Sequence, residues 1–132
     1  MIEELKYPQM DAAASIFKKL GIDPSTRFDE LDQDFEYTSC KLEELESYLA
    51  LYEKSCTSDL EKRVLGCFFL ECLNEYIHNN NQTHELHQKL IEILEKDVGI
   101  HKSELEYWAS SESENPEDWW PISKYIVKWK NT

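Results

Sequence analysis

Residues 59–78 read DLEKRVLGCFFLECLNEYIH, and this stretch decides the expected fold. Its apolar side chains are not confined to one stripe, because together they cover most of the circumference of a helix. A helix that is apolar nearly all round belongs in the middle of a fold. The sequence therefore predicts a central helix, with Thr57 or Ser58 as its N-cap.

Helices are also expected on both sides of this stretch. Apolar residues recur at helical spacing over residues 8–20 and again over 83–98, and Gly21 and Gly99 are expected to end these helices. A short helix is expected over 103–109. Pro121 is expected to open a closing helix, with a β-strand as the weaker alternative. The expected fold is all-α: a compact single-domain bundle of five to seven helices over residues 1–132.

The most regular apolar pattern lies between residues 28 and 52. Its members alternate steps of three and four, which is typical of an a/d stripe facing a partner surface. They are Phe28, Leu31, Phe35, Thr38, Leu42, Leu45, Leu49 and Tyr52. One helix of about 30 residues fits this pattern, as do two helices broken near residues 37–40 with Thr38 or Ser39 capping the second.

Two segments hold the negative charge. Residues 23–53 contain ten acids and two bases, residues 103–119 contain six acids and no base, and the whole chain has a net charge of −13. A small domain with two acidic segments on an otherwise balanced chain suits a cationic partner. In the first segment, the helical spacing places the acids outside and the apolar stripe inside.

The sequence contains no motif that indicates a catalytic, metal or cofactor site. Nucleophile motifs and phosphate-binding glycine loops are missing from it. His84 and His87 lie three residues apart, but they lack the spacing and the partners of a zinc site, so we expect a solvated pair. The four cysteines are expected to be free thiols and are Cys40, Cys56, Cys67 and Cys72.

The remaining observations concern where the protein acts. No apolar run approaches the ~20 residues of a membrane span, and the acidic N-terminus lacks the features of a signal peptide. We therefore expect a cytoplasmic protein that does not bind membranes. The one basic cluster, Lys124, Lys128 and Lys130, is too small against the net charge to favour direct binding of nucleic acid.

Aromatic residues bracket the second acidic segment. Trp108 is expected to fix this segment to the core, whereas the exposure of Trp119 and Trp120 stays open. Tryptophan is enriched at the centres of protein interfaces, and neighbouring acids suit a basic partner. The expected partner-binding residues are Asp29, Glu30, Asp32, Asp34, Glu36, Glu43, Glu44, Glu112, Glu114, Glu117, Asp118, Trp119 and Trp120.

The chain resembles, in overall character, the small immunity proteins of bacterial contact-dependent growth inhibition and related polymorphic toxin systems. The resemblance rests on its size, its charge, the acidic segment 28–53 and the acidic-aromatic stretch 107–120. It implies a non-enzymatic protein that binds one cationic toxin domain, frequently a nuclease, and blocks its active site or an essential surface. Trp119-Trp120-Pro121 only echoes the Tyr-Tyr-Pro element of helical nuclease-colicin immunity proteins, so no site is carried over.

Two other functions are compatible with the same sequence. A phage or mobile-element inhibitor of a defence nuclease, such as an anti-CRISPR protein or a DNA mimic, would also meet a cationic surface. An adaptor that self-associates through the apolar stripe is the second alternative. An enzyme ranks last because no motif supports one.

Overall fold

The computed structural model describes residues 7–109 and 119–129, and within these ranges the protein is helical with no strand. The α-helices are α1 (Met10–Lys19), α2 (Phe35–Thr38), α3 (Leu45–Tyr52), α4 (Asp59–Asn80), α5 (His87–Lys96) and α6 (Val98–Ala109). The all-α class expected from the sequence is confirmed. No helix within the described ranges is both long enough and apolar enough to cross a membrane.

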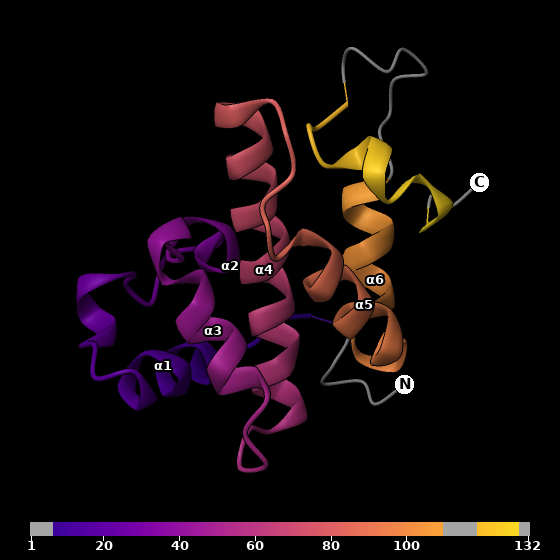
Figure 1. Ribbon diagram of the computed structural model, residues 1–132. Helices are drawn as coiled ribbons and strands as arrows, with labels where there is room; N and C mark the ends of the chain where they lie inside the picture. Colours follow the sequence, from indigo (N-terminus) through magenta and orange to yellow (C-terminus); the bar gives the residue numbers. More distant parts are fainter. Residues whose placement is uncertain (1–6, 110–118, 130–132) are drawn as a thin grey trace.

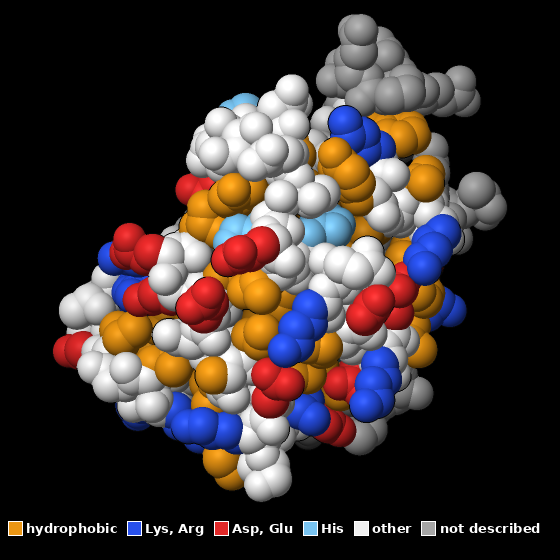
Figure 2. Space-filling model, viewed as in Figure 1, with side chains coloured by type: hydrophobic (Ala, Val, Ile, Leu, Met, Phe, Trp, Pro, Cys, Tyr) orange, Lys and Arg blue, Asp and Glu red, His pale blue; other side chains and the backbone are white. Residues whose placement is uncertain are grey.

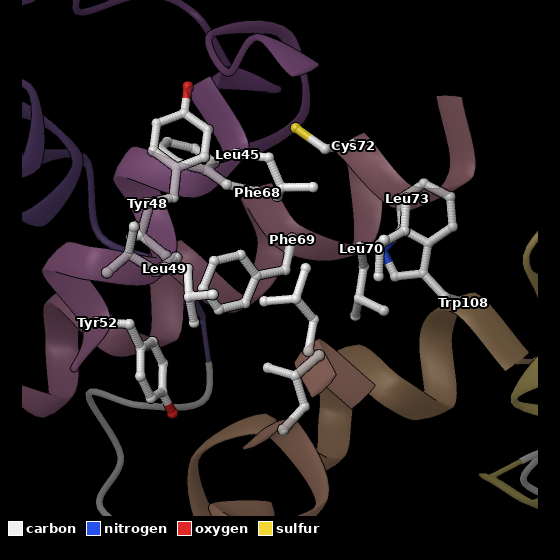
Figure 3. Packing of buried hydrophobic residues seen from close by; sticks show 14 of the residues in the cluster. Leu45, Tyr48, Leu49, Tyr52, Phe68, Phe69, Leu70, Cys72, Leu73 and Trp108 are labelled. Atoms are coloured by element: carbon white, nitrogen blue, oxygen red, sulfur yellow. The ribbon is translucent and has the colours of Figure 1, made fainter. Parts of the chain in front are cut away.

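Helix α4 is the centre of the molecule, as its sequence predicts. Figure 1 shows α1, α2 and α3 on one side of it and α5 and α6 on the other. Ser58 caps it, because its hydroxyl accepts from the Glu61 N–H while the Glu61 carboxylate accepts from the Ser58 N–H. Figure 3 shows Phe68 and Phe69 pointing toward Tyr48 and the other side chains of α3. Burying each such ring stabilises the fold by about 1.5–3 kcal/mol.

Gly66 lets α6 approach α4 closely. A Cβ at Gly66 would lie 2.5 Å from Nδ1 of His101, which is closer than side chains tolerate. His101 is fully buried, and its Nε2 lies 2.8 Å from the Tyr52 hydroxyl, which donates to Asp97 over 2.5 Å. The small residue in α4 thus sets the position of a polar side chain that links α3, α4 and α6.

The segment before α3 differs from both expectations for it. It contains a 3₁₀ turn, η2 (Pro24–Thr26), then irregular chain up to α2, and a second 3₁₀ turn, η3 (Leu42–Glu44), before α3. The single long helix is therefore wrong, while the expected break near residues 37–40 is present. Neither Thr38 nor Ser39 caps the second helix, because Lys41 and Glu44 hold the N-cap positions.

Aspartates explain why the first half of this segment is not helical. The Leu31 N–H donates to Asp29 Oδ1 (2.8 Å) and the Asp29 N–H donates to Asp32 Oδ2 (3.0 Å). Such local bonds offer the backbone an alternative to the helix. As a result Leu31, an expected member of the apolar stripe, is 83% exposed.

Three helix boundaries also need correction. The His84 ring accepts the Leu86 N–H (2.9 Å), and α5 begins only at His87 rather than near residue 83. Gly99 does not end α5 but lies in α6, and its backbone does not take a positive φ, unlike that of Gly21. The expected closing helix is replaced by two 3₁₀ turns, η5 (Ser123–Tyr125) and η6 (Val127–Trp129).

Candidate functional site

An ion pair between α4 and α6 forms the base of the candidate site. Arg63 and Glu104 are each almost fully buried, and an Arg63 guanidinium nitrogen lies 3.2 Å from a Glu104 oxygen. Arg63 also donates to the Cys67 sulfur over 3.1 Å. Burial and the nearby Glu104 charge raise the pKa of the Cys67 thiol, so this cysteine is neutral and inert.

Glu104 holds two aromatic side chains in place above this ion pair. Its other carboxylate oxygen accepts from the Tyr37 hydroxyl (3.1 Å) and from the Trp108 indole N–H (3.0 Å). Tyr37 comes from α2 and Trp108 from α6, so one carboxylate links elements far apart in the sequence. A carboxylate satisfied by three donors is held in one geometry, and it fixes the rings it contacts.

These rings continue outward to the surface. The Tyr37 ring stacks on that of Tyr107 with centroids 5.8 Å apart, and the Tyr107 and Trp120 centroids are 4.9 Å apart. Trp108 is buried, but Tyr107 is 46% and Trp120 37% exposed. We call Tyr37, Tyr107, Trp108 and Trp120 the aromatic surface. It has two exposed rings, supported by the half-buried Tyr37 and the buried Trp108.

The C-terminal segment that carries Trp120 is tied to the rest of the fold. The Ile122 N–H donates to Asn74 Oδ1 on α4 (3.0 Å), and the Ser123 hydroxyl donates to the Trp108 carbonyl (2.7 Å). Further along, the Trp129 indole donates to Glu95 on α5 (2.8 Å). Trp120 is therefore attached to a part of the chain that is hydrogen-bonded to both α4 and α6.

Carboxylates adjoin the aromatic surface. Asp34 is exposed, Glu36 is half-buried, and α2 carries Glu36 directly before Tyr37. Burial, followed by the charges of Glu104 and Asp34, raises the pKa of Glu36. Burial and the charges of Glu104, Asp34 and Glu36 likewise raise the pKa of Tyr107. We call Asp34 and Glu36 the acidic rim. The exposed Tyr107 ring is thus within electrostatic reach of this rim.

The structure places the expected partner-binding residues in different settings. Asp29, Glu30, Asp32, Asp34 and Glu43 are exposed, and Trp119 is half-buried. Glu44 is engaged inside the molecule, because it forms a bidentate ion pair with Arg27 and accepts from the Tyr48 hydroxyl (2.6 Å). Glu112, Glu114, Glu117 and Asp118 lie outside the described residues.

Sequence reasoning missed the buried network, although one signal of it was visible. Glu104 was counted as part of an acidic segment, yet it is buried and paired. Arg63 lies in the stretch 59–78, whose apolar side chains cover most of the circumference of a helix. A charged residue at such a position needs a buried partner of opposite charge. The sequence therefore indicated that some partner exists, but not that Glu104 is that partner.

His84 and His87, the pair singled out in the sequence, lie in different surroundings. Within the described residues, no group of three or more His, Cys, Asp or Glu is arranged to hold a metal ion. His84 accepts a backbone N–H at Nδ1, so the proton of its neutral ring is on Nε2. Neither ring nitrogen then has a lone pair available to bind a metal ion. His87 is buried, not solvated as expected, and contacts Tyr125. Figure 2 shows histidine side chains in the middle of one face, with acidic and basic side chains around them.

Comparisons with known proteins add no relative. No protein-family model matches the chain, and neither the curated proteins nor the solved structures contain a match.

Proposed function

We propose that this protein is a non-enzymatic inhibitor that binds and neutralises a cationic protein in the cytoplasm, and that this partner is a nuclease toxin domain. One observation carries the proposal. Five acids and no base lie between residues 28 and 38, and this acidic stretch adjoins an exposed, rigidly supported aromatic surface. Exposed aromatic rings at the centre and charges at the rim are the usual anatomy of a binding surface.

The acids of this stretch are available to a partner. Asp29, Glu30, Asp32 and Asp34 are exposed, and the ion pairs formed among the described residues use other acids. Charges that are not neutralised internally attract a cationic surface and accelerate association. A nuclease cleft carries such a surface because it must bind phosphates. Carboxylates on this protein would occupy that cleft in place of nucleic acid.

The adaptor alternative receives less support. It requires the apolar stripe of residues 28–52 to be available at the surface, yet Phe35, Leu45 and Leu49 are buried in the core. An inhibitor of a defence nuclease would use the same acidic stretch as an immunity protein. The identity of the captured partner separates these two, since a toxin domain supports the first proposal and a defence nuclease supports the alternative.

The first experiment identifies the partner. The tagged full chain is used to retain proteins from a lysate of its natural host at low salt, and a 0.5 M salt wash tests whether charge holds the complex. We expect one basic protein in stoichiometric amount, whose nuclease activity falls to zero when one equivalent of this protein is added. A retained partner without nuclease activity would contradict the nuclease part of the proposal.

A charge-reversal pair then tests the surface. Glu30→Lys with Asp34→Lys changes two exposed acids whose side chains make no hydrogen bond or ion pair with a described residue. The matched control is Glu85→Lys with Glu92→Lys, two exposed acids on the turn before α5 and on α5. We expect the first pair to weaken binding about tenfold or more and the control to change it much less. Equal weakening by both pairs would show that only net charge matters.

A further inference from the structure

The aromatic surface is built more precisely than binding by bulk charge requires. Its two exposed rings, Tyr107 and Trp120, contact each other, and each contacts a partly or fully buried ring beneath. Tyr37 and Trp108 in turn are held by Glu104. The two exposed rings are tilted by 42° to each other, and rings with so much support lose little side-chain freedom when something binds there.

We propose that the aromatic surface takes a single arginine side chain of the partner protein, with the guanidinium packed against the Tyr107 and Trp120 rings and its N–H groups directed at Asp34 and Glu36. This inference rests on the proposed function, since it names the group through which a cationic partner is anchored. It assigns Tyr107 and Trp120 as the stacking residues and the acidic rim as the acceptor of the guanidinium protons.

The chemistry of the surface favours arginine over lysine. A guanidinium is planar, stacks on aromatic faces and offers several donors in a fixed fork, whereas an ammonium is a compact and strongly hydrated point charge. Two exposed rings, one of them within electrostatic reach of Asp34 and Glu36, match the planar group in both respects. Glu36 is already partly desolvated, so a bound cation would relieve an unfavourable burial.

Other occupants fit less well. A nucleobase also stacks on tyrosine and tryptophan, but its phosphates would be repelled by the acidic rim and by the net charge of −13. A second copy of this chain would bring the same negative charge to the surface. A neutral apolar peptide would leave Asp34 and Glu36 without a cation. The negative charge of Asp34 and Glu36 therefore favours a cationic side chain as the occupant of the aromatic surface.

The test uses the full chain and capped pentapeptides with one central residue between glycines. The central residue is arginine, lysine, norleucine or citrulline, the last being nearly the same shape as arginine without its charge. Binding is followed by two-dimensional NMR of the Tyr107 amide and the Trp120 indole. We expect saturable shifts with the arginine peptide in the millimolar range, weaker shifts with lysine and none with citrulline or norleucine.

Two variants and a matched control locate the site. Tyr107→Leu and Glu36→Gln should each weaken binding of the arginine peptide about fivefold. Tyr125→Leu is the control, because Tyr125 is 42% exposed, similar to Tyr107, but has the chain's own Lys124 over its ring. We expect this control to bind the peptide as the unchanged protein does. Circular dichroism and NMR dispersion show whether each variant is folded.

The outcomes separate this inference from the proposed function. If arginine and citrulline peptides bind equally, or if Tyr125→Leu weakens binding as much as Tyr107→Leu, the arginine site is overturned. If a folded Tyr107→Leu protein still binds the captured partner with unchanged affinity, the inference fails while the inhibitor function stands. If the arginine peptide binds as expected but no basic partner is captured, the surface stands and the proposed function fails.

Discussion

Helix α4 and residues 23–44 show how differently two parts of one small chain obtain their structure. Residues 23–44 are the part of the first acidic segment that precedes α3, and we call them the acidic segment. In α4, the capping box and the apolar circumference both favour the same central helix. In the acidic segment, the apolar spacing favours a helix while Asp29 and Asp32 bond to nearby backbone N–H groups. Where local hydrogen bonding and the apolar pattern favour the same structure, the sequence predicts that structure. Where they favour different structures, local hydrogen bonds can prevent the helix that the pattern predicts.

The two regions also differ in what their polar side chains bond to. The polar groups around α4 are bonded to each other inside the molecule, whereas most acids of the segment are exposed, including Asp29, Glu30, Asp32, Asp34 and Glu43. Changes near α4 should therefore alter the stability of the fold, and changes in the segment should alter binding with little effect on stability.

The largest effect is expected from breaking the buried ion pair. In Arg63→Met, the Glu104 carboxylate loses its cation and stays buried. Removing one partner of a buried pair destabilises a protein by about 3–5 kcal/mol. Urea unfolding followed by circular dichroism measures the change in the free energy of unfolding. A loss below about 1 kcal/mol would show that Glu104 finds water or another donor, and that the aromatic surface does not depend on Arg63.

The pH dependence of stability is the next largest effect. Burial, assisted by the Arg63 charge, lowers the pKa of His101 from its ordinary 6.5 to about 3. The folded state therefore keeps this histidine neutral, and its contribution is complete above pH 6.5 and is lost as the pH falls toward 3. At pH 5 the loss from His101 is about 2 kcal/mol.

Unfolding in urea between pH 7 and pH 5 checks this prediction. The pKa of His87 is also lowered, mainly by burial, so it adds to the loss in the same direction. The variant His101→Leu should be less stable at pH 7 but should lose less of its stability between pH 7 and 5. An unchanged pH slope in this variant would contradict the assignment to His101.

Gly66→Ala should have a smaller effect. The added methyl would lie 2.5 Å from His101 Nδ1 and 2.7 Å from its Cε1, so the ring or α6 must move. Overpacking of this kind, partly offset by the better helix propensity of alanine, should lower the free energy of unfolding by about 1–2 kcal/mol. The matched control is Gly99→Ala, where a Cβ meets no atom within 4 Å. Equal stability of the two variants would contradict the close approach of α4 and α6.

How much the sequence could predict follows from the same residues. The helix at 59–80 and its Ser58 cap were predictable, because the pattern and the cap need only neighbours in the chain. The Glu104 network was not, since it joins residues 37, 63, 104 and 108 by side-chain bonds across three helices. The exposure of Leu31 was missed because apolar spacing alone does not reveal that the Asp29 and Asp32 side chains accept hydrogen bonds from nearby backbone N–H groups.

The smallest effect is expected at Leu31. In a regular amphipathic helix this leucine would face the core, and Leu31→Ser would cost several kcal/mol, as Leu73→Ser should in α4, where Leu73 is fully buried. Because Leu31 is 83% exposed, its replacement should change the free energy of unfolding by less than about 0.5 kcal/mol. Urea unfolding of both variants compares the two leucines directly. A large loss at Leu31 would mean that residues 28–34 pack as the apolar spacing predicts, and the acids beside it would then lie on a helix rather than on an exposed turn.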